Sequence, residues 1–155
     1  MKSFLIACFA LLLATPAAAQ SETQPVPNMT QCLLAVQTLD QRYRDWMQIR
    51  CLSTAGDICI AQDNAEGTSC LSDLASETRA FTMSLLNSLP DEIEGNGFQA
   101  RGYARSLQTA RDMLENIPEC VGMTGQDQTI CEYIQLGTRL TELIYHAREN
   151  GFPVN

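Results

Sequence analysis

The most specific chemistry in the sequence belongs to six of its seven cysteines: Cys32, Cys51, Cys59, Cys70, Cys120 and Cys131. Cysteines can bind metal or run redox chemistry. However, the chain has no Cys-x-x-Cys pair, and His146 is the only histidine that could complete a zinc site. We therefore predict no metal site and no cofactor. An even number of cysteines in an exported chain is typical of a disulfide framework, so we expect three disulfides.

Export is indicated by the N-terminal segment. Residues 1–19 combine a lysine, an apolar run and a final Ala-Ala-Ala, which is the pattern of a secretory signal cleaved after Ala19. The apolar run is much shorter than the ~20 residues that a membrane-spanning helix needs, and no later segment reaches that length. We expect a periplasmic or secreted protein without a membrane span, with a flexible tail at 20–28 and a single helical domain at 29–155.

Charge narrows the choice of partner. Cleavage after Ala19 removes the only lysine, leaving nine arginines against 18 acidic residues and a net charge of −9. Coulomb repulsion argues against nucleic acid and against an anionic membrane surface. A basic partner protein is favoured instead.

Apolar residues recur at helical spacing in four segments, at about 29–51, 70–89, 98–117 and 127–149. In the first segment we expect a core-facing stripe of Cys32, Val36, Leu39, Tyr43 and Trp46. The segment 52–69 is polar and is predicted to be a long loop. The pattern predicts an all-α fold, a disulfide-stapled antiparallel four-helix bundle made of two helical hairpins.

The pairing of the cysteines is constrained by this helical pattern. On one unbroken helix Cys32 and Cys51 would lie ~28 Å apart, whereas a disulfide needs Cα atoms within ~7 Å. We therefore favour Cys51–Cys70 and Cys120–Cys131, which leaves Cys32–Cys59. The alternative pairs Cys59 with Cys70 and Cys32 with Cys51. It fits the equal spacing of Cys59–Cys70 and Cys120–Cys131 better, but it needs a kinked first helix.

An acidic turn between the second and third helices is the candidate partner-binding site. It contains Asp91, Glu92, Ile93 and Glu94 between Pro90 and a glycine-rich stretch. The acids either stabilise the positive end of the following helix or form a protruding contact loop. Acids in the long segment, Asp57, Asp63 and Glu66, are explained by loop solubility.

Two Thr-Arg pairs, Thr78-Arg79 and Thr138-Arg139, recur after the equally spaced cysteines. We expect each arginine to pair with an acidic neighbour across its hairpin. His146 is expected on the surface near a helix C-terminus. No nucleophile and base stand at recognisable spacing, so we predict no catalytic residues and no enzyme activity.

The chain resembles the LprI-type lysozyme-inhibitor family of small exported helical proteins over residues 31–145. The resemblance is carried by Cys131-x7-Arg139-x3-Leu143 preceded by Cys120, by Cys51, Glu66-Gly67-Thr68-Ser69, Cys70 and Thr78-Arg79, and by Trp46 and Arg50. It implies a periplasmic or secreted helical protein, and the family name adds inhibition of lysozyme. We therefore expect an exported, non-enzymatic helical protein of the bacterial envelope that inhibits lysozyme by occlusion. The alternative is a periplasmic module that binds a small ligand or a protein, for which Met47, Met83, Met113 and Met123 give slight support.

Overall fold

A computed structural model describes residues 28–66, 69–95 and 97–154. The segment 1–19, predicted to be a signal, and most of the tail predicted at 20–28 lie outside the described residues. The described residues form five α-helices and one 3-10 turn, with no strand. The helices are α1 (Met29–Val36), α2 (Gln41–Glu66), α3 (Cys70–Ser88), α4 (Gly97–Glu115) and α5 (Gly125–Glu149), and the turn η1 (Pro118–Cys120) precedes α5.

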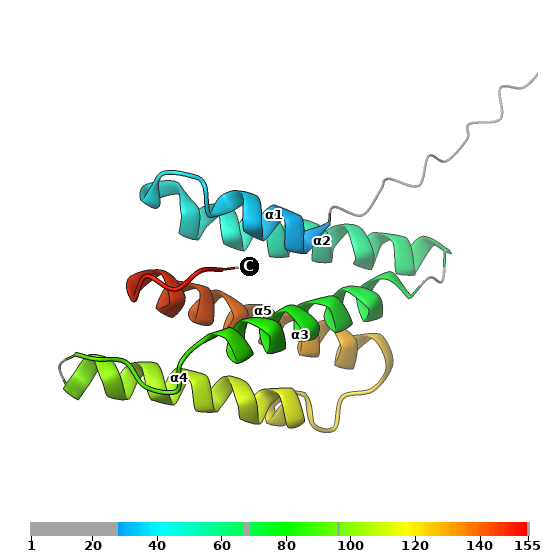
Figure 1. The fold of residues 1–155 in the computed structure, drawn as a ribbon. Coiled ribbons are helices and arrows are strands. Elements are labelled where there is room, and N and C mark those ends of the chain that lie inside the picture. Colours follow the sequence, from blue (N-terminus) through cyan, green and yellow to red (C-terminus); the bar gives the residue numbers. More distant parts are fainter. Residues whose placement is uncertain (1–27, 67–68, 96, 155) are drawn as a thin grey trace, which may run out of the picture.

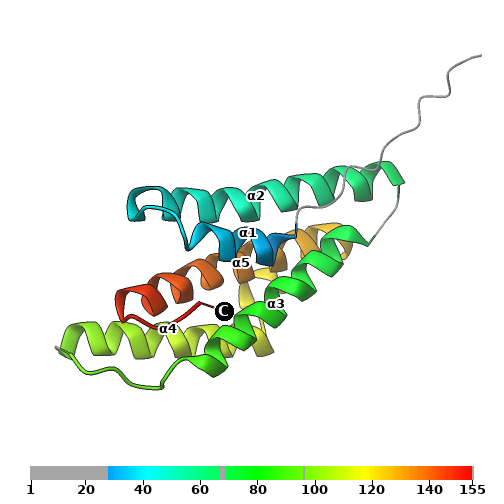
Figure 2. The same cartoon turned by 45° about the horizontal axis from the view of Figure 1, so that its top comes forward.

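The helices pack as a bundle around the pair α3 and α5. Figure 1 shows α1 and α2 along one side of this pair and α4 along the other, and Figure 2 shows the same order after rotation. α3 and α5 share the most extensive contact between any two described helices. The all-α, disulfide-stapled prediction is confirmed, with five helices in place of the expected four. None of the described helices is long and apolar enough to cross a membrane.

The first predicted helix, 29–51, is broken at residues 37–40. Asn28, which we expected in the flexible tail, caps α1 by accepting a hydrogen bond from the Gln31 amide. After the break, the Asp40 carboxylate accepts a hydrogen bond from the Arg42 amide (3.2 Å) at the start of α2. The chain therefore turns back on itself, and α1 packs beside α2.

This hairpin settles the disulfide pairing. Cys32 pairs with Cys51 at a Cα separation of 5.8 Å, because the break brings the two residues side by side. Cys59 pairs with Cys70, so the favoured pairs Cys51–Cys70 and Cys32–Cys59 are wrong and the alternative is observed. The pair Cys120–Cys131 is confirmed and joins η1 to α5.

The segment 52–69, predicted to be a long loop, is mostly helical and belongs to α2 up to Glu66. Asp63 does more than keep this segment soluble. Its carboxylate accepts hydrogen bonds from the backbone amides of Cys70 (2.9 Å) and Leu71 (3.0 Å) at the start of α3. One acidic side chain of α2 thereby satisfies two amides that α3 leaves without intrahelical partners.

The three later helices lie where the periodicity predicts them, each to within one turn. Pro90 follows the end of α3, and Pro118 follows α4. After α5, Gly151 adopts φ +72°, and the Phe152 amide donates to the Ala147 carbonyl (2.8 Å). This left-handed cap turns the C-terminal residues back, so that Phe152 and Val154 pack against the core.

Candidate partner-binding face

The first turns of α2 expose large apolar side chains that we expected in the core. Trp46 and Ile49 are each 59% exposed, Tyr43 is about half exposed, and Leu39 is exposed as well. The expected core stripe is therefore wrong beyond Val36. After the break at 37–40, α2 buries a different set, which includes Gln48, Cys51, Leu52, Ala55 and Cys59.

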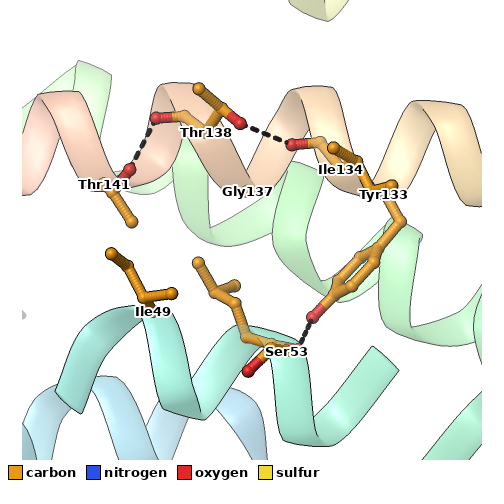
Figure 3. Close-up of a pocket in the computed structure, with 8 residues that line it drawn as sticks. Ile49, Ser53, Tyr133, Ile134, Gly137, Thr138 and Thr141 are labelled. Carbon is orange, nitrogen blue, oxygen red and sulfur yellow. Dashed lines mark hydrogen bonds between the residues drawn. The ribbon is translucent and has the colours of Figure 1, made fainter. Parts of the chain in front are cut away.

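A groove runs between this part of α2 and the middle of α5 (Figure 3). Its volume is about 210 Å³, and Ile49 faces Thr141 across it. At one end, the Tyr133 hydroxyl donates a hydrogen bond to the Leu52 carbonyl (2.5 Å). Burial raises the pKa of Tyr133 far above its usual value, so the ring stays neutral and its hydrogen bond fixes α5 against α2.

Glycine lets the two helices approach at this end of the groove. A Cβ on Gly56 would lie 2.7 Å from Cε1 of the Tyr133 ring, closer than real side chains come. Gly137 on α5 lies against the Leu52 side chain, where a Cβ would meet it at 3.5 Å. The two glycines therefore allow α2 and α5 to pack closely here.

The α5 side of the groove carries its own exposed apolar stripe. Ile134 and Tyr145 are each about half exposed and stand at helical spacing with Thr138 and Thr141. Both threonine hydroxyls donate to carbonyls of α5 itself, at Ile134 (2.9 Å) and Thr138 (2.7 Å). The threonines therefore add no unsatisfied donor to the groove. We call Tyr43, Trp46, Ile49, Ile134 and Tyr145 the α2–α5 face.

Arginines accompany the aromatic rings of this face. The guanidinium of Arg50 lies 5.3 Å from the centre of the Trp46 ring, and that of Arg42 lies 5.0 Å from the centre of the Tyr43 ring. Arg42 also pairs with Asp40, whereas Arg50 has no ion pair within the described part of the chain. Exposed tryptophan, tyrosine and arginine are the side chains most enriched at the energetic centres of protein interfaces.

A salt bridge fixes the relative position of the two helices beside this face. Arg148 of α5, whose side chain is 11% exposed, donates to the Asp45 carboxylate of α2 at 2.7 Å. The bridge closes the end of the α2–α5 contact opposite Tyr133. The face is thus held by fixed elements at both ends.

The acidic turn is more strongly anchored than its sequence suggests. Asp91 pairs with Arg111 of α4 at 2.6 Å, and the hydroxyl of buried Tyr103 donates to the Pro90 carbonyl at 2.6 Å. Ile93 packs against the core. Of the four predicted contact residues, only Glu92 and Glu94 are exposed carboxylates without an ion pair among the described residues.

The expected pairing of the two Thr-Arg arginines across the hairpins is wrong. Arg79 donates to the Leu114 carbonyl of α4 at 2.5 Å. Arg139 pairs with Glu142 of its own helix at 2.7 Å and contacts the Met113 sulfur. Each arginine thus donates to a neutral acceptor on α4, a carbonyl or a sulfur. The repeated Thr-Arg pair therefore reflects the packing of α3 and α5 against α4.

His146 lies in the last turn of α5, as expected, but it is half-buried. Its ring makes edge contacts with Tyr103 (5.9 Å between centres) and Tyr145 (5.5 Å). Burial lowers its pKa, opposed in part by Glu142 and Glu149. The ring is therefore neutral near pH 7 and brings no positive charge to its surroundings.

Comparison with family models, curated proteins and solved structures finds no match to this chain.

Proposed function

We propose that the protein is an exported, non-catalytic binding protein of the bacterial envelope, which acts by covering part of a partner protein. The α2–α5 face is the observation that carries this proposal. Two exposed isoleucines, Ile49 and Ile134, line its groove, and the same two helices carry three half-exposed rings, Tyr43, Trp46 and Tyr145. Exposed apolar patches of more than a few hundred Å² are rare in monomers and mark interaction sites.

A lysozyme is the partner that we propose, on the strength of the family resemblance and of charge. Lysozymes are commonly basic, and a mature chain of net charge −9 would attract them over distances of about 10 Å in 0.1 M salt. In this proposal the overall charge speeds encounter, and the α2–α5 face supplies the lasting contact. Occlusion then means that the bound protein blocks the substrate cleft of the enzyme.

The decisive experiment measures binding and inhibition of a panel of lysozymes by the mature protein and by the variant Trp46→Ala/Ile49→Ala. We expect the double variant to bind about thirtyfold more weakly, because truncating a central interface residue costs about 2 kcal/mol or more. Met83→Ala is the matched control, since Met83 is an exposed apolar residue of α3 outside the face. This control should bind like the wild type.

A second pair of variants separates local contact from general attraction. Glu92→Lys/Glu94→Lys reverses the two exposed acids of the turn, and Asp57→Lys/Glu119→Lys reverses two exposed acids elsewhere. Equal losses of association rate at low salt would support steering by total charge. A loss confined to the turn would move the contact there and contradict the assignment to the α2–α5 face. Absence of binding to every lysozyme at micromolar concentration would remove lysozyme as the partner.

A further inference from the structure

A second hollow lies near the C-terminal end of α5, bounded by the acidic turn and the first turns of α4. Its volume is about 310 Å³, and we call it the α4–α5 cleft. Ile93, Phe98, Gly102, Tyr145, His146 and Glu149 contribute to its lining. Its size is at the lower end of the range for small-molecule sites, about 300 to 1,000 Å³.

Two exposed aromatic rings from different helices line this cleft. Phe98 of α4 is 82% exposed, and Tyr145 of α5 is about half exposed. Gly102 lies one helical turn after Phe98 on α4. No atom lies within 4 Å of a Cβ built on Gly102, so the space beside Phe98 is open. Aromatic faces carry partial negative charge and attract cations that come within about 6 Å of the ring centre.

The charges around the cleft are mostly negative. Glu149 is part of its lining, and Glu92 and Glu94 are the exposed sequence neighbours of the lining residue Ile93. The neighbouring Arg111 is paired with Asp91. Arg101 lies along the first turn of α4, where its Nη1 would be 3.0 Å from a Cβ on Gly97, and it is not part of the lining.

His146 adds polarity to the cleft without adding charge. Within the described residues, its ring contacts Tyr103 and Tyr145 by their edges and makes no hydrogen bond. A neutral imidazole can accept a hydrogen bond from a ligand and does not repel a cation.

We propose that the α4–α5 cleft binds a small organic cation of the alkylated ammonium class, with its alkyl groups against Phe98 and Tyr145 and its charge near Glu149. Alkylated ammonium ions suit this lining because they are weakly hydrated, spread their charge over apolar groups and bind aromatic faces. This proposal does not rest on the partner-binding function proposed above, because it uses a different pocket and a different chemistry. The two sites share Tyr145, whereas Phe98 and Glu149 belong to the cleft alone.

Choline is the probe that we would use, with its neutral isostere 3,3-dimethyl-1-butanol as the comparison. Titration calorimetry should show saturable choline binding, and the isostere should bind at least about tenfold more weakly, because it lacks the charge. The ring protons of His146, the only histidine, should shift in NMR spectra on addition of choline. Equal affinity for the two compounds, no saturation below about 50 mM choline, or binding without a His146 shift would each overturn the proposal.

Variants test the two interactions separately. Phe98→Leu and Tyr145→Leu keep apolar bulk but remove the aromatic face, and each should weaken choline binding at least about threefold while leaving the isostere unchanged. Glu149→Gln should weaken choline binding in the same way. Tyr43→Leu, an exposed tyrosine outside the cleft, is the matched control and should have no effect. Equal weakening by this control, or no weakening by the three cleft variants, would contradict the assignment.

Discussion

Helix α5 makes two very different contacts, one with α3 and one with α2. Against α3 it buries a continuous apolar surface, and even the hydroxyls of buried Thr78 and Thr82 are satisfied within α3. Against α2 its apolar packing is close near Gly56 and Leu52, and the Arg148–Asp45 salt bridge adds a polar contact, while Ile49 and Ile134 remain half exposed beside an open groove. The α3–α5 contact therefore provides stability, and the α2–α5 contact leaves apolar surface available to a partner.

The largest effect is expected in the α3–α5 contact. Leu140 lies on α5, is completely buried and belongs to the main core. Leu140→Ala should lower the free energy of unfolding by about 2 to 5 kcal/mol, because it removes buried apolar atoms and leaves a cavity. Urea denaturation measures this change. Thr138→Ala on the exposed side of the same helix is the control, and an equal loss there would contradict the division between the two contacts.

Removal of the disulfide that holds α1 to α2 should have the next largest effect. The Cys32–Cys51 bridge closes a segment with a sequence separation of 19 residues. Replacing both cysteines by alanine should cost about 3 kcal/mol, because the unfolded chain gains conformational freedom. Thermal unfolding of the double variant tests this value. An unchanged melting temperature would mean that packing alone holds the α1–α2 hairpin.

Gly56→Ala tests the close end of the α2–α5 contact. The added Cβ would overlap the Tyr133 ring, so the variant should lose about 1 to 3 kcal/mol of stability despite the better helix propensity of alanine. Gly102→Ala is the matched control within α4, where no atom lies within 4 Å of the added group. It should gain about 0.5 to 1 kcal/mol. The same sign for both variants in urea denaturation would contradict the close contact at Gly56.

The sequence predicts α3, α4 and α5 well because each has a strong apolar stripe and a clear stop signal. The prediction of helix bounds and buried residues fails in the N-terminal half for a physical reason. The apolar spacing continues in phase from Val36 through Leu39 to Tyr43, although the chain leaves the helix there and Asp40 starts a new one. The aspartate before Gln41 is the signal that could have revealed this break.

Helix α2 beyond Cys51 is hard to predict because much of its buried face is made of small residues. Ala55, Gly56 and Cys59 pack inward without forming an apolar stripe that periodicity detects. Their burial depends on Tyr133, which is distant in sequence, and on the Cys59–Cys70 bridge. Trp46 is exposed because α2 buries a different set of residues after the break at 37–40. The candidate face can therefore be recognised only in the folded chain.

The acidic turn was correctly located by its sequence, but its anchoring was not predictable. Asp91 meets Arg111 only because α4 runs back past the turn. The two residues are 20 positions apart in the chain. The contact-loop hypothesis for Asp91, Glu92, Ile93 and Glu94 therefore remains a prediction, and it now depends on Glu92 and Glu94.

The central claim is that the α2–α5 face serves binding and contributes little to folding. Its most direct test is the free energy of unfolding of the variant Trp46→Ala/Ile49→Ala in urea. Because both side chains are 59% exposed, we expect a change within about 0.5 kcal/mol of the wild type. A loss of about 2 kcal/mol or more would show that the two side chains support the fold itself, and would contradict the claim.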